Sequence, residues 1–386
     1  MAGLESSFFL IFTGAALLAT LALQLRQPII VAYIVLGALL GPYGFSAVSD
    51  TAMLETISRI GIVFLLFLLG LDLQPQSLMR LFGRMAFVAF GSSLLFALAG
   101  ALIGYAYGFT STESIVIGVA MMFSSTIISL KLLPTTALHH KHTGELVIGI
   151  TLLQDVLAII ALVLLSGKSE DRNLAHLGLT LVSLPALAIL AGATVRWLLV
   201  PLLMRFDRFK EYVFLLAVGW CLGVAELAEI LGLSREIGAF IAGVALASSP
   251  IAFYIAEQLK PLRDFFLVMF FFSVGAGFNH GLLGAIWMPA LALTLLMLVL
   301  KPVVFATLLR ATRESWRVGW EIGFRLGHCS EFSLLLAYIA VASGLLGERA
   351  ALLVQATSIA TMLLASYIVV FRYPSPIAIS DRLRKD

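Results

Sequence analysis

Long apolar runs follow one another along the whole chain, and they constrain its fold more than any other feature of the sequence. A helix needs about 20 apolar residues to cross the hydrocarbon core of a bilayer, and it satisfies its own backbone hydrogen bonds there. We therefore predict an all-α polytopic membrane protein. Charged residues, Gly and Pro at the connections delimit thirteen candidate spans: 7–25, 28–44, 59–73, 85–107, 113–131, 143–166, 176–204, 211–231, 235–248, 261–278, 285–309, 316–344 and 348–371.

The composition excludes a soluble protein. Hydrophobic residues make up 61% of the 386 residues and charged residues 12%, against roughly 45–50% and about 25% in typical soluble domains. A formal net charge of +3 is too small for a nucleic-acid-binding surface. Cys221 and Cys329 lie in apolar runs with neither zinc-ligand spacing nor a disulfide framework. Phosphate-binding loops, nucleophile elbows and paired carboxylates are absent from the sequence, so we expect neither an enzyme nor a cofactor.

Positive charge is distributed unequally between alternate connections. With the N-terminus outside, 17 of the 25 Lys and Arg residues lie in cytoplasmic connections, five lie in outer connections and three lie within spans. This bias follows the positive-inside rule in every alternate loop. It predicts a cytoplasmic C-terminus and a multi-pass protein of the inner (plasma) membrane. The first residues carry no Lys or Arg before the apolar run, so we expect no cleaved signal peptide.

Three segments recur in order at nearly one offset. Residues 32–34 resemble 239–241, residues 62–72 resemble 267–277, and the polar interruption at 123–126 falls opposite 329–332. The offset of about 205 residues covers seven spans, an odd number, so the second copy crosses the membrane in the opposite direction.

This repeat predicts one transmembrane transport unit over 1–371. Its inverted repeats cover about 1–166 and 211–371, helix 176–204 links them, and residues 372–386 form a short cytoplasmic tail. Inverted repeats with interrupted helices at matching positions are typical of secondary transporters, which bind their substrate where the interruptions meet. A duplicated channel or scaffold is the alternative.

Asp155 is the clearest candidate for function, because a charge in mid-membrane is unfavourable by roughly 2.5–3.5 kcal/mol on insertion scales. It lies near the middle of the predicted span 143–166 with no cationic neighbour in that span. A carboxylate there can hold a dehydrated monovalent cation or a proton, and competition between the two is sufficient for an antiporter. The alternative is a structural Asp that binds free amides of a broken helix.

Lys301 is the natural counter-charge, deep in span 285–309 and directly before Pro302, which weakens the helix. We expect Lys301 to pair with Asp155; a lysine that snorkels to the inner interface is the alternative. The hydroxyls of Ser124, Ser125 and Thr126 offer cation ligands, although small hydroxylated residues also pack helices together.

Glu331 lies in span 316–344, and the negative charge of an acid inside the membrane must also be compensated. Arg325 and Glu321, in the same span, are placed to share that role. Glu331 serves equally well as an ion ligand or as the neutraliser of a helix end.

Three other groups carry weaker signals. Glu226 and Glu229 read as an interfacial pair near the outer face, and Asp72 ends a span near the inside. The cytoplasmic histidines His139, His140 and His142 lack helical ligand spacing, and a pH-sensing role for them is a minor alternative to a basic turn.

Together these motifs resemble the monovalent cation:proton antiporter-2 family over about residues 8–371. The similarity is carried by Gln154-Asp155, Ser124-Ser125-Thr126, residues 271–275, Lys301 and residues 327–332. Gln before the Asp most resembles the glutathione-gated potassium efflux branch. Such relatives usually carry a C-terminal nucleotide-binding domain, whereas this sequence ends 15 residues after its last predicted span.

The resemblance implies a sodium/proton antiporter-like fold of thirteen helices, with a dimer domain and a six-helix core that holds two crossed, broken helices. It implies a homodimer in which the core moves as an elevator. It also implies that Asp155 carries the ion and proton, that Lys301 neutralises or bridges to it, and that Thr126, Gln154 and Ser330 lie near the crossing.

The predicted function is therefore secondary antiport of a monovalent cation, preferably K⁺, against H⁺. The predicted ion-binding and proton-binding residues are Asp155, Gln154, Thr126, Ser125 and Ser330, and the predicted charge-compensating residues are Lys301, Glu331 and Arg325. Na⁺(Li⁺)/H⁺ exchange is the alternative within the class, and a gated cation channel is the alternative outside it.

Overall fold

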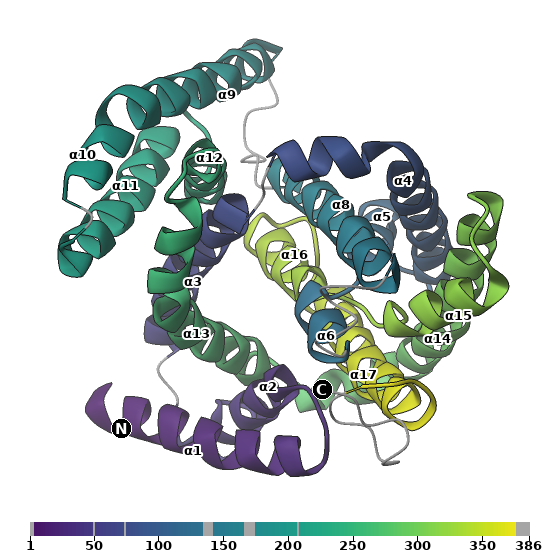
Figure 1. Cartoon of the computed structure of the whole chain (residues 1–386). Helices are drawn as coiled ribbons and strands as arrows, with labels where there is room; N and C mark the ends of the chain where they lie inside the picture. The colour runs from purple at the N-terminus through teal and green to yellow at the C-terminus, as the bar shows by residue number, and fades with distance from the viewer. Residues whose placement is uncertain are drawn as a thin grey trace. The chain divides into compact units, whose positions relative to one another are not determined.

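The computed structural model describes residues 4–48, 51–72, 75–133, 142–165, 174–206 and 208–375 (Figure 1). All the elements in this part of the chain are helices. The chain divides into two compact units. The first consists of Val48–Met79 and Ser166–Ser273, and the second of Ala2–Ala47, Arg80–Leu165 and Val274–Asp386.

The first unit contains α3 (Thr51–Asp72), α9 (Leu174–Thr194), the π-helix η1 (Val195–Leu199), α10 (Val200–Arg205), α11 (Lys210–Ile230), α12 (Arg235–Ala247) and most of α13 (Ala252–Ala276). Helix α12 packs on α3, α9 and α11. The core between them is aliphatic and aromatic, with Phe67, Ala217 and Ile255 fully buried.

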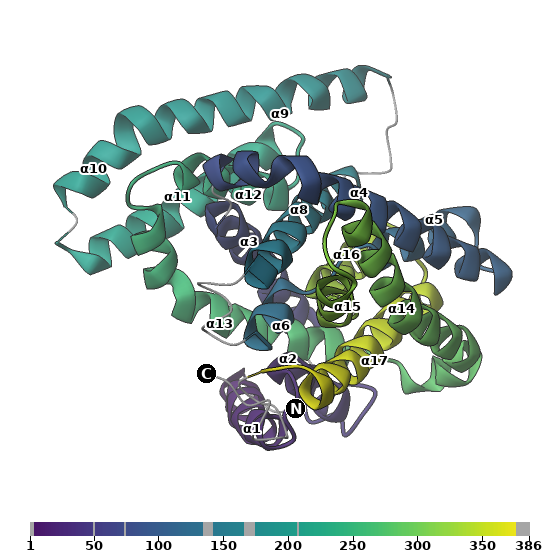
Figure 2. The ribbon, with the colours of Figure 1, turned by 45° about the vertical axis from the view of Figure 1, so that its right-hand side comes forward.

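The second unit contains α1 (Leu4–Gln24), α2 (Ile29–Leu40), most of α4 (Pro75–Ala106), α5 (Ser111–Met121), α6 (Thr126–Lys131), α8 (His142–Leu165), η2 (His280–Leu282), α14 (Leu283–Ala311), α15 (Trp316–Arg325), α16 (Glu331–Ala342) and α17 (Glu348–Arg372). Here α14 packs on α15 and α17, and α16 on α5, α8 and α17. Figure 2 shows α15 beside α14, above α17.

Seven described helices are long and apolar enough to cross a membrane, and four shorter ones are apolar. The all-helical architecture confirms the predicted fold class, whereas the count of thirteen spans stays a prediction. Two predicted spans, 113–131 and 316–344, are each interrupted, the first between α5 and α6 and the second between α15 and α16.

The predicted start of span 261–278 is wrong. Helix α13 begins at Ala252 and runs through Pro261, which removes one backbone donor without ending the helix. Pro289 and Pro302 likewise lie inside α14. A Pro beside charged residues is therefore a weak boundary signal in a chain whose helices pack against one another.

Two glycines at matching positions of the predicted repeats lie at close helix contacts, while the repeats themselves stay a prediction. In the first unit Gly70 of α3 faces α12, and a Cβ at Gly70 would lie 2.5 Å from the Phe240 carbonyl oxygen. In the second unit Gly275 of α13 faces α2, and a Cβ there would lie 1.9 Å from the Ile34 carbonyl oxygen. The two glycines stand 205 residues apart in the sequence and the two carbonyls 206. Each of these two close contacts between helices requires glycine.

Candidate ion site at the crossing of two broken helices

The two interruptions contact each other inside the second unit. Ser124 Oγ donates to the Leu326 carbonyl at 2.8 Å, and the Ser125 amide lies 3.3 Å from His328 Nδ1. One turn away, Ser333 Oγ donates to the Ala120 carbonyl at 2.5 Å. The serines and His328 of the interruptions at 122–125 and 326–330 therefore bond backbone groups that an uninterrupted helix would pair internally.

Each interruption restarts as a helix at a serine. Ser125 Oγ accepts from the Ile128 amide at 3.1 Å and caps α6, while Ser330 Oγ accepts from the Phe332 amide at 3.2 Å and caps α16. Serine is among the preferred N-cap residues because its oxygen replaces a missing carbonyl. Both hydroxyls, which we predicted as ion ligands, are thus engaged in capping.

Lys301 binds the free carbonyls of the crossing. Its ammonium donates to the Phe123 carbonyl at 2.7 Å and to the His328 carbonyl at 2.9 Å, and Ser124 Oγ lies at 3.4 Å. The side chain is fully buried, which excludes snorkelling. Since α5 and α15 both end here, two helix C-termini direct partial negative charge at this position.

The expected ion pair between Lys301 and Asp155 is absent among the described residues. The hydrogen bonds of the ammonium go to carbonyls and one hydroxyl rather than to a carboxylate. The physical reason is that the C-terminal ends of the two broken helices supply partial negative charge, which stabilises the Lys301 ammonium in place of a carboxylate. The sequence pattern does not show that these two helix ends meet.

Asp155 lies on α8 with 2% of its surface exposed. Its Oδ2 accepts from Thr126 Oγ1 at 3.0 Å, and its Oδ1 has no hydrogen-bond partner in the described part of the chain. Thr126 is the first residue of α6, so the carboxyl stands at the positive end of a short helix. A buried carboxyl with one free oxygen is a suitable ligand for a proton or a cation.

Gln154 forms its hydrogen bonds with the interruption between α5 and α6. Its Oε1 accepts from the Ser124 amide at 3.1 Å, and its Nε2 donates to the Met122 carbonyl at 3.3 Å. Both ends of the side chain amide are engaged, so the prediction of Gln154 as a direct ion ligand is not supported. It holds the end of α5 in place beside Asp155.

Glu331 is 8% exposed, in the first turn of α16, where Ser330 Oγ donates to its Oε2 at 3.3 Å. Glu331 directly follows Ser330, which caps α16 at the crossing. The helix N-terminus also favours an acid at this place. Asp155 and Glu331 are therefore the two carboxyls of the crossing.

Arg325 is 1% exposed. We predicted that it compensates the charge of Glu331, but its hydrogen bonds go to other groups. Its guanidinium pairs with Glu321 at 2.9 Å and donates to the Leu132 and Pro374 carbonyls, each at 2.8 Å. Leu132 closes α6, and Pro374 follows α17. Arg325 thus joins α15, α6 and the chain after α17.

Sequence reasoning missed the role of His328, although it singled out the motif around it. The ring is fully buried, with Nδ1 3.3 Å from the Ser125 amide and 3.1 Å from the Cys329 carbonyl. Nε2 lies 3.4 Å from Ser129 Oγ. With Nε2 protonated, Nδ1 accepts from the Ser125 amide and Nε2 donates to Ser129 Oγ, and with Nδ1 protonated the ring donates to the Cys329 carbonyl instead. The sequence signal that could have indicated this role is the position of His328, two residues before the N-cap Ser330.

The remaining candidates lie elsewhere. Glu226 and Glu229 are exposed and both pair with Arg235 in the first unit. His142 Nε2 lies 2.9 Å from Glu314 Oε1, whereas His139 and His140 fall outside the described residues. The described residues contain no group of three or more His, Cys, Asp or Glu placed to hold a metal ion.

Comparison with known proteins agrees with this geometry. The family described as "Sodium/hydrogen exchanger, transmembrane" matches residues 10–371. The glutathione-regulated potassium-efflux system protein KefC of Cronobacter sakazakii is 30% identical over 339 residues, which are 85% of this chain and 54% of that protein. The iron transporter MagA of Paramagnetospirillum magneticum is 26% identical over 362 residues, which are 92% of this chain and 82% of that protein.

A solved structure shows the same fold. The sodium proton antiporter MjNhaP1 of Methanocaldococcus jannaschii superposes with a TM-score of 0.71 at 17% sequence identity, over 94% of this chain and 95% of that one. This similarity concerns the fold alone. The chain spans about half the length of the potassium efflux relatives that it matches.

Proposed function

The chain belongs to the sodium/hydrogen exchanger transmembrane family, and from that premise we propose that it is a secondary antiporter of a monovalent cation, preferably K⁺, against H⁺. The family assignment makes it a multi-pass membrane protein of a transporter family. The exchanged ions, the mechanism and the dimer are the parts that we propose.

The observation that carries the proposal is the free Oδ1 of buried Asp155. A charged, unpaired carboxylate in a low-dielectric interior is unfavourable by several kcal/mol. Lys301 does not relieve this charge directly, because its ammonium is held by the Phe123 and His328 carbonyls. The Asp155 carboxyl is therefore stable when it holds a proton or a cation, and it is unstable when it holds neither of them. Exclusion of the empty state is what couples the two ions.

The donor set favours a monovalent cation. Asp155 Oδ1 together with the Thr126 hydroxyl offers hard oxygen ligands and one formal negative charge. Alkali ions suit such ligands, whereas transition metals bind best to imidazole, thiolate or several carboxylates. The names of the potassium efflux relatives favour K⁺ over Na⁺ or Li⁺.

We further propose an elevator-type alternation within a homodimer. Both broken helices, Asp155 and Lys301 belong to one compact unit, and this supports movement of the site as a rigid body. A gated channel instead needs a continuous pore, and only 2% of the Asp155 surface is exposed.

Reconstituted vesicles with an internal pH dye test the function. We expect K⁺ added outside to release protons from the vesicles, with smaller responses to Na⁺ and Li⁺ and none to Fe²⁺. Exchange limited to Na⁺ and Li⁺ would support the alternative within the class. Cation flux without proton movement would overturn antiport in favour of a channel.

Asp155→Asn tests the site. We expect exchange to fall to the level of protein-free vesicles, because the amide neither releases a proton nor balances a cation. Asp264→Asn is the matched control, since that carboxyl is 64% exposed and lies in the first unit. Wild-type exchange by Asp155→Asn would contradict the assignment.

A further inference from the structure

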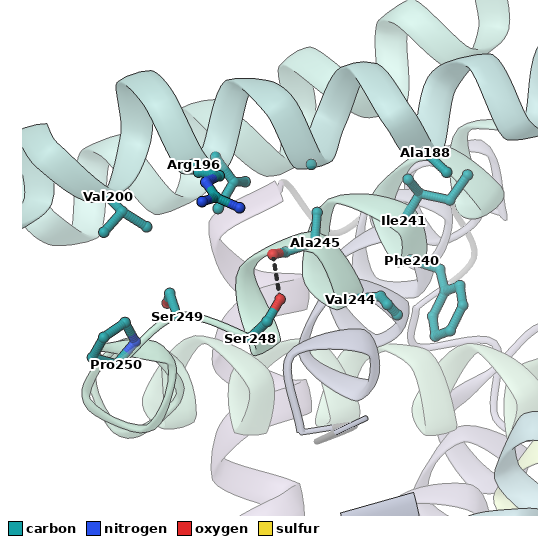
Figure 3. A pocket seen from close by; sticks show the side chains of 12 residues that line it. Ala188, Arg196, Val200, Phe240, Ile241, Val244, Ala245, Ser248, Ser249 and Pro250 are labelled. Atoms are coloured by element: carbon teal, nitrogen blue, oxygen red, sulfur yellow. Dashed lines mark hydrogen bonds between the residues drawn. The ribbon is translucent and has the colours of Figure 1, made fainter. Parts of the chain in front are cut away.

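A cavity of about 660 Å³ lies within the first unit, between the long α9–η1–α10 helix and the C-terminal end of α12. It is separate from the ion site, because none of the residues that line it is part of the crossing. Figure 3 shows its wall residues, with Arg196 above the end of α12.

One part of the cavity is polar and cationic. The Arg196 guanidinium lines it without a carboxylate or hydrogen-bond partner in the described part of the chain. Ser249 Oγ is buried and likewise has no partner there, while Ser248 Oγ donates to the Ala245 carbonyl at 3.2 Å. An unpaired guanidinium beside a free hydroxyl is suited to bind a phosphate group.

The rest of the wall is apolar. Ala188, Val200, Phe240 and Val244 line the cavity without a charged group. Free inorganic phosphate gains nothing from such a wall, whereas the glycerol and upper acyl chains of a lipid bury apolar surface against it.

A local widening of the helix accompanies the position of Arg196. Pro201 has no amide hydrogen, and the turn before it is a π-helix, Val195–Leu199, closed by the Val200 amide on the Val195 carbonyl. Single π-turns are frequent at functional sites. Trp197 in the same turn is 77% exposed, as expected of a residue near a membrane interface.

The depth of Arg196 fits a lipid headgroup. Leu174–Arg205 forms one run of 32 residues, about 48 Å long, and therefore exceeds a hydrocarbon core of about 30 Å. Arg196 lies nine residues before Arg205, about 13 Å from the helix end. The charge bias places that end at the cytoplasmic leaflet, where anionic lipids are attracted by basic residues.

We propose that this cavity binds the headgroup phosphate of an anionic phospholipid from the cytoplasmic leaflet, held by Arg196 and Ser249, with its chains along the apolar wall. Basic pockets between transmembrane helices on this side are suited to such lipids. Bound lipid would tie the linking helix to α12 within the first unit.

Native mass spectrometry and thermal unfolding of the purified full chain test the proposal, with phosphatidylglycerol or phosphatidylcholine added in detergent. We expect phosphatidylglycerol to be retained and to raise Tm more than phosphatidylcholine does. Arg196→Gln should lower the affinity for phosphatidylglycerol about fivefold to tenfold, and Arg196→Lys should retain most of it. Arg205→Gln, in the same helix but outside the cavity wall, is the matched control and should bind normally.

Two further arms identify the occupant. Ala188→Trp keeps Arg196 but fills the apolar wall, and it should also abolish retention of phosphatidylglycerol. Unchanged retention by Arg196→Gln would overturn the proposal. It would also be overturned if inorganic phosphate raised Tm as much as phosphatidylglycerol, which would indicate a free-anion site. The proposal would also be overturned if Arg196→Gln dissociated a dimer and left lipid binding unchanged. That result would indicate that a second copy of the chain occupies the cavity.

Discussion

Single polar groups inside the second unit have different tasks although they lie close together. Asp155 has one oxygen engaged and one free, whereas the Lys301 ammonium and both ends of the Gln154 amide form hydrogen bonds with the interruptions. The residue with spare bonding capacity is the one expected to exchange ligands. The engaged residues keep its surroundings fixed while it does so.

Thr126→Val tests the neighbour of Asp155 at this scale. The change removes the hydroxyl that donates to Oδ2 and keeps the side-chain volume. We expect the half-saturating K⁺ concentration for proton release to rise about fivefold to tenfold, which corresponds to about 1–1.5 kcal/mol. Thr307→Val is the control, because that exposed hydroxyl bonds only to its own helix. An unchanged K⁺ dependence would exclude Thr126 from the site.

Lys301→Met tests the hydrogen bonds from the Lys301 ammonium to the two carbonyls of the crossing. The variant leaves the Phe123 and His328 carbonyls buried without their donor, and we expect a loss of roughly 2–5 kcal/mol of stability, seen as a lower Tm in detergent. Lys260→Met, at a side chain that is 49% exposed, should leave Tm unchanged. A Tm equal to wild type would show that the ammonium does not hold the crossing together.

At the scale of elements, the broken helices depend on small residues that permit close approach and on serines that restart each helix. The interruptions at 122–125 and 326–330 end in Ser caps and are joined by His328. Outside the interruptions, glycine brings α13 and α2 together within the second unit. These contacts fix the angle at which the elements meet.

Gly275→Ala tests this close approach. The added Cβ would lie 1.9 Å from the Ile34 carbonyl oxygen, so the backbone of α13 or α2 must shift. We expect a loss of roughly 1–3 kcal/mol or more in stability, measured by thermal unfolding. Gly284→Ala in α14 meets nothing within 4 Å, and it should be neutral or slightly stabilising by about 0.5–1 kcal/mol. Equal behaviour of the two variants would refute the contact.

At the scale of the whole molecule, the charge bias predicts which connections face the cytoplasm. A cysteine scan measures this orientation, since Cys221 and Cys329 are both buried. We expect a membrane-impermeant maleimide to label Phe45→Cys in intact cells and Phe209→Cys only after lysis. Both positions are exposed, 78% and 65% respectively. Labelling in the opposite pattern would invert the topology.

By itself the sequence determined the all-helical membrane fold and the two interruptions, and it predicts the inverted repeats and an ion-binding role for Asp155. These features follow from local hydropathy, from repeated patterns and from the energetic penalty of a buried charge. Such signals can be recognised from the order of residue types along the sequence.

Only the tertiary structure decided which partner each buried group has. It directed Lys301 to two carbonyls 178 and 27 residues away, Gln154 to the end of α5 and Arg325 to the chain after α17. The partners are backbone atoms exposed by helix ends that meet in space. Side-chain types along the sequence do not reveal these atoms, because any residue carries a carbonyl and only folding leaves it unpaired.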